Sequence, residues 1–144
     1  MTPLRKLFQL SPREAWLLLQ AAALLPAVRL ALRFTTVSQL RNFSEDAVHD
    51  RRASDLSPQA TARMVRVAAR YGMCRAKCLE QSLALRWLLR RQGFDARILL
   101  GARKEDGQIQ AHAWVEIDGI SLDEEKDIHQ TFSRFEKMAA SDAN

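Results

Sequence analysis

The chain has 144 residues, which is enough for one domain of ordinary size and too few for two. Hydrophobic residues make up 47% of it and charged residues 27%, so it can bury a core, and disorder throughout the chain is excluded. The net charge of +5 permits an acidic partner without requiring one. Two cysteines, Cys74 and Cys78, are too few for a secreted disulfide framework, so we expect a reduced, cytoplasmic protein.

A long apolar helix is predicted near the N-terminus. Residues 11–14, Ser-Pro-Arg-Glu, form a capping box with proline at the first helical position, and the helix should run to Phe34 with a bend near Pro26. Its most apolar stretch is interrupted by Gln20, Pro26 and Arg29, and by this measure falls short of the roughly 20 apolar residues of a membrane span. No signal-peptide pattern precedes it. We expect a half-buried helix, with docking on a partner protein or a membrane face as the alternative.

Two shorter helices follow. Ser57-Pro58 predicts the start of the second, which Gly72 ends. The third begins near Lys77 or Cys78 and runs to about Gln92, with Gly93 in the position where a left-handed residue ends a helix.

After Gly93 the spacing of hydrophobic residues changes from that of a helix to that of strands. We predict strands over 96–101, 110–117 and 120–123, with a turn at 104–107 and a two-residue hairpin at Asp118-Gly119. Helices followed by a small antiparallel sheet define an α+β fold. The whole chain, 1–144, is interpreted as one domain, with a helical N-terminal region over 1–56 and a core over 57–144.

Cys78 and His112 are the candidates for chemistry. Cys78 falls in the first turn of the third helix, where free N–H groups and the helix dipole favour a thiolate, and Arg75 and Lys77 add positive charge. A thiolate is a nucleophile, and a histidine held on a strand can accept and return its proton.

The pairing expected in the second hairpin predicts a third candidate, an acid next to His112. If Asp118-Gly119 is the turn, Trp114 faces Asp123 and His112 faces Glu125, and all four share one face of the sheet. Asp123 is then diagonal to His112, about 7–8 Å away between Cα atoms, close enough for a carboxylate to orient the imidazole. Glu125 is the second choice, and a slip of one residue would exchange the two faces.

Each of these residues also has an ordinary structural explanation: a buried cysteine, a structural histidine and a strand-end carboxylate are all common. A zinc site would use Cys74 and Cys78 with His112 or His129, but one Cys-x₃-Cys pair is a weak zinc signal.

A nucleic-acid module is the other alternative. The densest basic run, which holds Arg86, Arg90 and Arg91, is explained by a solvated helix face, and no nucleic-acid motif is present.

Two stretches resemble the protease domain of the lasso-peptide biosynthesis B protein, a transglutaminase-like cysteine peptidase. They are 78–93, CLEQSLALRWLLRRQG, and 111–116, AHAWVE, which Asp118-Gly119 follows. The N-terminal Leu-Ser-Pro-Arg-Glu and the closing Phe132-Ser133-Arg134-Phe135 fit the stand-alone form of that protein, so the resemblance spans nearly the whole chain.

The resemblance implies a transglutaminase-like, papain-like fold and a leader peptidase that prepares a precursor peptide for a separate ATP-dependent cyclase. Carried over by position, Cys78 is the nucleophile, His112 the general base and acid, and Asp123 the orienting residue. A separate leader-recognition protein is the implied partner, and no metal or organic cofactor, nucleic acid or membrane association is expected. The alternatives are a transglutaminase-type acyl transferase, and a non-catalytic interaction domain on the same fold.

Overall fold

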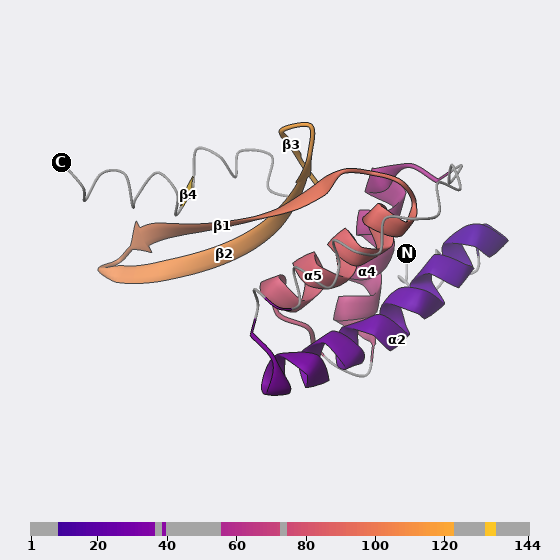
Figure 1. The fold of residues 1–144 in the computed structure, drawn as a ribbon, viewed down its shortest axis with the longest axis horizontal. Helices are drawn as coiled ribbons and strands as arrows, with labels where there is room; N and C mark the ends of the chain where they lie inside the picture. The colour runs from indigo at the N-terminus through magenta and orange to yellow at the C-terminus, as the bar shows by residue number, and fades with distance from the viewer. Residues whose placement is uncertain (1–8, 37–38, 40–55, 73–74, 123–131, 135–144) are drawn as a thin grey trace.

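The computed structural model describes residues 9–36, 39, 56–72, 75–122 and 132–134. Three helices come first: α2 (Pro12–Phe34), α4 (Pro58–Tyr71) and α5 (Cys78–Arg91). The strands follow as β1 (Ala96–Glu105), β2 (Gln108–Ile117), β3 (Ile120–Ser121) and β4 (Ser133–Arg134). They form one antiparallel sheet in the order β3-β2-β1-β4, so the predicted α+β fold is confirmed (Figure 1).

The helix boundaries follow from the capping residues. Ser11 and Ser57 cap α2 and α4, and each helix has proline next. At the end of α5, Gly93 has φ +92°, and the Phe94 N–H donates to the Leu89 carbonyl at 3.0 Å. The predicted boundaries of all three helices are therefore confirmed to within a residue.

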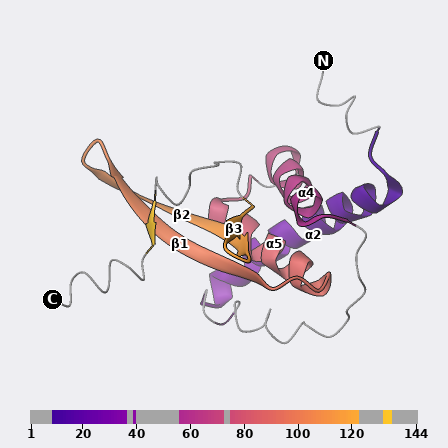
Figure 2. The same cartoon turned by 90° about the horizontal axis from the view of Figure 1, so that it is seen from above.

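The sheet differs from the prediction in the length of its first hairpin. The strands β1 and β2 continue to Glu105 and Gln108, so Lys104 and Glu105 belong to a strand and not to the predicted turn. The turn is only Asp106 and Gly107, both with positive φ, which is the geometry that lets two strands pair up to a two-residue loop. In Figures 1 and 2 the tip of this hairpin extends beyond the helices.

Helix α5 is the centre of the packing. It contacts both long strands and both other helices, and one buried cluster joins the helices to one face of the sheet. That cluster includes Ala21, Leu25, Val65, Leu88 and Val115. Because Ala21 and Leu25 come from α2, this first helix is part of the same core as the rest of the fold.

A second, smaller cluster lies on β2 outside the main one. It consists of Trp114 and Phe132, with Leu99 packed against them. Phe132 immediately precedes β4, a strand that the sequence did not predict and that pairs with Gly101 and Ala102 of β1.

One face of α2 is buried and another is exposed. The exposed large apolar side chains are those of Trp16, Leu19, Leu30 and Phe34. Among the described residues, α2 meets the length and composition expected of a membrane span, with a mean hydropathy of 1.7 over its most apolar window. The prediction that this segment falls short of a span is therefore wrong by that test. Gln20, Pro26 and Arg29 do not lower the mean hydropathy of the window enough. A core helix of a soluble protein passes the same test.

A pH dependence follows from the capping box of α2. The Ser11 N–H donates to the Glu14 carboxylate at 3.0 Å, and Arg63 of α4 pairs with that carboxylate. These contacts, the Ser11 backbone N–H first, hold the pKa of Glu14 below its ordinary value. The stabilisation is therefore complete above the ordinary pKa and is lost as the pH falls through the lowered one.

We predict that Glu14→Gln is less stable than the wild type at pH 7, and that the difference shrinks as the pH falls below the ordinary pKa of a glutamate and through the lowered pKa of Glu14. Chemical denaturation at a series of pH values measures it. A difference that stays constant with pH would mean that the ionised carboxylate does not supply the stabilisation.

Candidate functional site

Cys78 is the first residue of α5, as the sequence predicted. Its thiol is free and half-buried, and the residues Arg75 and Lys77 just before it are exposed. The free N–H groups of the first helical turn and these two cations give the position a positive electrostatic environment. Nucleophilic cysteines commonly occupy such positions.

Cys78 and His112 line the same cavity, although 33 residues separate them in the chain. The cavity has a volume of about 140 Å³ and lies between α4, α5 and β2. Most of its wall is apolar, and the polar contributions come from Cys78, His112, Arg66, Gln81 and Ser82. The fold thus brings together two of the three residues that the sequence singled out for chemistry.

Aromatic rings hold the imidazole of His112. The Trp114 ring is stacked beside it, with centroids 6.3 Å apart and planes 17° apart. The Phe132 ring lies 5.2 Å away with an interplanar angle of 31°. Rings from two different segments of the chain therefore lie against the imidazole and limit the orientations that it can adopt.

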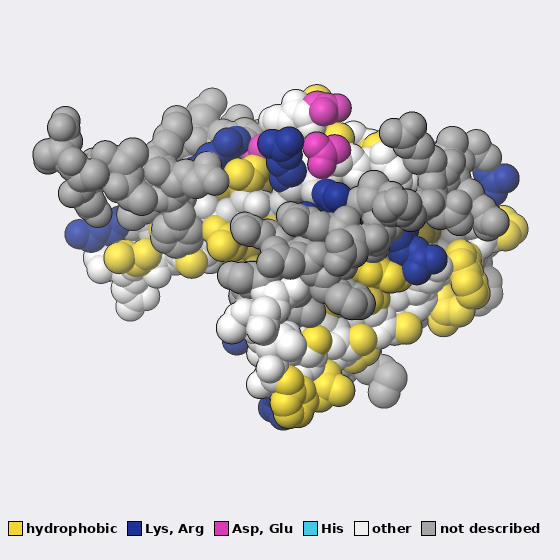
Figure 3. Space-filling view, viewed as in Figure 1, with side chains coloured by type: hydrophobic (Ala, Val, Ile, Leu, Met, Phe, Trp, Pro, Cys, Tyr) yellow, Lys and Arg dark blue, Asp and Glu magenta, His cyan; other side chains and the backbone are white. Residues whose placement is uncertain are grey.

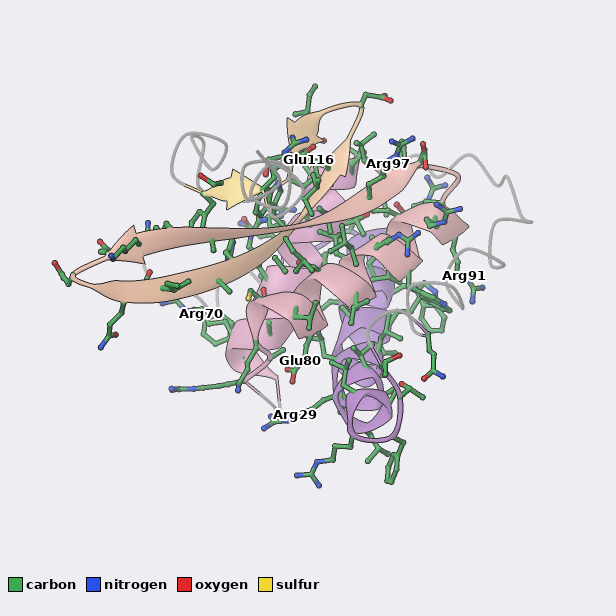
Figure 4. All side chains as sticks on the ribbon, turned by 60° about the vertical axis from the view of Figure 1, so that its left-hand side comes forward. Arg29, Arg70, Glu80, Arg91, Arg97 and Glu116 are labelled. Carbon is green, nitrogen blue, oxygen red and sulfur yellow. The ribbon has the colours of Figure 1, made fainter. Side chains whose placement is uncertain are left out.

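Trp114 is in turn held by a charged pair. Its indole N–H donates to the buried Glu116 carboxylate at 2.8 Å, and Arg134 of β4 donates to both oxygens of that carboxylate at 3.1 and 3.2 Å. Glu116 is labelled in Figure 4, on β2 close to β4. A buried carboxylate with three donated hydrogen bonds is well satisfied, so it can fix both the indole and β4.

The orienting acid cannot be located, because Asp123 and Glu125 lie outside the described residues. The register of the β2–β3 hairpin, from which they were predicted, is observed up to Leu122. Ile117 pairs with Ile120, and the Leu122 N–H donates to the Val115 carbonyl at 2.9 Å. Arg66 of α4 donates to the Leu122 carbonyl at 3.0 Å, so the chain is held next to the cavity one residue before Asp123.

Sequence reasoning missed three polar residues of the cavity. Gln81 and Ser82 lie three and four residues after Cys78, so helical spacing alone could have put them on the same face. Arg66 gave no such signal, because it belongs to a different helix and reaches the cavity only through the packing of α4.

The prediction that Arg86 lies on a solvated helix face is wrong. This side chain is buried, and its Nε donates to the Ala96 carbonyl at 3.1 Å, because α5 packs directly on the start of β1. Arg91, by contrast, is exposed and lies over the Trp87 ring. For the zinc alternative, Cys74 and His129 lie outside the described residues. Within the described ranges, no group of three His, Cys, Asp or Glu residues could hold a metal ion.

The family model of the transglutaminase-like superfamily matches residues 21–137, and the chain therefore belongs to this superfamily. The match includes Cys78, His112 and Asp123, and it begins within α2. Comparison with curated proteins and with solved structures gave no match. The superfamily includes cysteine peptidases.

Gly101 makes the packing of Trp114 possible. A Cβ atom there would lie 2.8 Å from the indole ring and 2.9 Å from the Ser133 carbonyl oxygen. We predict that Gly101→Ala lowers the free energy of unfolding by about 1–3 kcal/mol, because either the indole or β4 must move. Denaturant unfolding measures this, with Lys104→Ala on the same strand as the exposed control. Equal stability of the two variants would contradict the tight packing.

Proposed function

We propose that this protein is a cysteine peptidase that removes the leader from a ribosomally made lasso-peptide precursor. The observation that carries the proposal is the shared cavity of Cys78 and His112 in a chain of the transglutaminase-like superfamily. The resemblance of residues 78–93 and 111–116 to the lasso-peptide B protein supports the choice of substrate.

In the proposed reaction the Cys78 thiolate attacks the carbonyl carbon at the end of the leader. N–H groups at the start of α5, including that of Cys78, stabilise the oxyanion. The His112 imidazolium donates a proton to the departing core amine as the C–N bond breaks, leaving a thioester. His112 then takes a proton from water, whose oxygen displaces the sulfur and releases the leader as a carboxylic acid.

The remaining roles rest on the resemblance and on the hairpin register. Asp123 orients His112, with Glu125 as the second choice. The chemistry needs no metal and no organic cofactor. We propose that residues 57–144 supply the catalytic core of a single domain and that the protein acts in the cytoplasm.

We further propose that a separate leader-recognition protein delivers the precursor, and that the exposed face of α2 contacts it. Apolar side chains gather at both ends of α2 in Figure 3. Trp16 and Leu19 are each 60% exposed and Phe34 is 81% exposed, although the helix they belong to is anchored in the core. Exposed large apolar side chains on a helix that is anchored in the core are typical of a protein contact. The ATP-dependent cyclase would act on the released core.

Cleavage of a matching precursor tests the function. With the leader-recognition protein present, wild-type protein should release a leader fragment at the hydrolytic mass, and Cys78→Ala should release none. Asp123→Asn should lower kcat by roughly 10²-fold or more, because it removes the orienting carboxylate. Glu125→Gln should lower kcat less. Mass spectrometry of the products measures cleavage by the wild type and the three variants.

Equal cleavage by wild type and Cys78→Ala would exclude Cys78 as the nucleophile. A product carrying an added amine in place of water would identify acyl transfer. Absence of cleavage with the partner bound would favour a non-catalytic domain.

The partner contact has its own test. Trp16→Glu should raise the Kd for the leader-recognition protein by about tenfold or more, because it puts a charge into an apolar contact. Ile109→Glu, which alters another largely exposed apolar side chain, near the tip of the β1–β2 hairpin, is the control. Titration calorimetry measures both, and an unchanged Kd for Trp16→Glu would remove α2 as the docking surface.

A further inference from the structure

The peptide bond between Ala76 and Lys77, just before the cysteine, is held at both of its polar ends. The Lys77 N–H donates to Glu80 Oε2 at 2.9 Å, and the Ala76 carbonyl accepts from Gln81 Nε2 at 2.8 Å. Both side chains come from the first turn and a half of α5. One peptide plane is thus fixed against the same helix that begins with Cys78.

The Gln81 bond has no role in ordinary helix capping. In a capping box the side chain of the third helical residue accepts from the N-cap N–H, and the bond from the Lys77 N–H to Glu80 is that half of one. The carbonyl of Ala76 lies outside the helix and is not one of the groups that capping must satisfy. Gln81 also lines the cavity of Cys78 and His112, so the bond ties the wall of the cavity to the turn before the cysteine.

Glu80 is itself anchored to a second helix. Its residue is only 8% exposed, and its Oε1 lies 3.9 Å from Nε of Arg29 in α2. Figure 4 shows the two labelled side chains lying close together between α5 and α2. A buried carboxylate needs such partners, so Glu80 is held both by the Lys77 N–H and by the Arg29 cation.

The next peptide bond carries the Cys78 N–H. Its carbonyl, that of Lys77, accepts from the Gln81 backbone N–H at 3.0 Å, which is the first helical hydrogen bond of α5. With the preceding peptide plane also fixed, the direction of the Cys78 N–H and the Cα–Cβ bond of Cys78 have little freedom. The rate of a reaction falls steeply when the reacting atoms are misaligned by even a small amount.

We propose that Glu80 and Gln81 are positioning residues for Cys78: together they clamp the Ala76–Lys77 peptide and so set the direction of the thiol and of its backbone N–H. The inference rests on the proposed function of Cys78 as a nucleophile. Arg29 of α2 pairs with Glu80 but is not part of the clamp. Neither Glu80 nor Gln81 is required to touch the substrate.

Four variants test the clamp in the full chain. Glu80→Met removes the acceptor for the Lys77 N–H, and Gln81→Met removes the donor to the Ala76 carbonyl at nearly constant volume. Glu80→Gln keeps an oxygen that can accept from Lys77 and loses only the charge facing Arg29. Glu14→Met is the matched control, since it removes an equivalent capping carboxylate, paired with Arg63, at the start of α2.

Two measurements are made on each variant. The first is kcat and KM for precursor cleavage with the leader-recognition protein present. The second is amide hydrogen exchange of residues 75–80, which needs no substrate. Glu80→Met and Gln81→Met should lower kcat by about 10- to 100-fold with KM within about twofold. Exchange of this segment should rise by about tenfold. Glu80→Gln should recover most of kcat, and Glu14→Met should change neither kcat nor the exchange of residues 75–80.

The inference fails if Gln81→Met and Glu80→Met, both folded by circular dichroism, keep the wild-type kcat and exchange rate. It also fails if Glu80→Gln loses as much kcat as Glu80→Met, because the ion pair with Arg29 would then be responsible. Should the wild type itself not cleave, the proposed function falls, and the exchange rates alone decide whether the clamp exists.

Discussion

The candidate site depends on one packing arrangement, in which the apolar face of α5 lies against strand β2. Leu85 and Leu88 of α5 and Val115 of β2 belong to one buried cluster. Since a helix and a strand that pack side by side bring their ends to defined positions, this contact decides where Cys78 lies relative to His112. The cavity that both residues line exists because helix α4 and the residue Leu122 close the space between them.

Alternate residues of strand β2 pack on opposite faces of the sheet. Val115 joins the main core on one side, while Trp114 joins Phe132 on the other and Glu116 binds Arg134. His112 contacts the same rings as Trp114. The histidine therefore lies against the segment around β4, whereas Glu80, two residues after the cysteine, pairs with Arg29 of α2. The contacts around the two candidate residues thus come from opposite ends of the chain.

Local signals in the sequence predicted the helices and the second hairpin well. Ser11-Pro12, Ser57-Pro58, Gly72 and Gly93 act through capping and φ preferences of a few residues, so they can be read without the fold. The bond from the buried Arg86 to Ala96 and the bond from Arg134 to Glu116 join residues that are 10 and 18 positions apart, and only the packed sheet creates them. The pairing of β4 depends on the same packing, because two residues carry no periodicity of their own.

The account's central claim is that Cys78 and His112 act on each other in one cavity. Alkylation of Cys78 by iodoacetamide, followed by peptide-resolved mass spectrometry to separate it from Cys74, tests that claim without a substrate. The account predicts that Cys78 in the wild type reacts at neutral pH much faster than in His112→Gln, by about tenfold or more, because the imidazole takes the thiol proton. Equal rates in the two proteins, or a Cys78 that does not react in either, would contradict it.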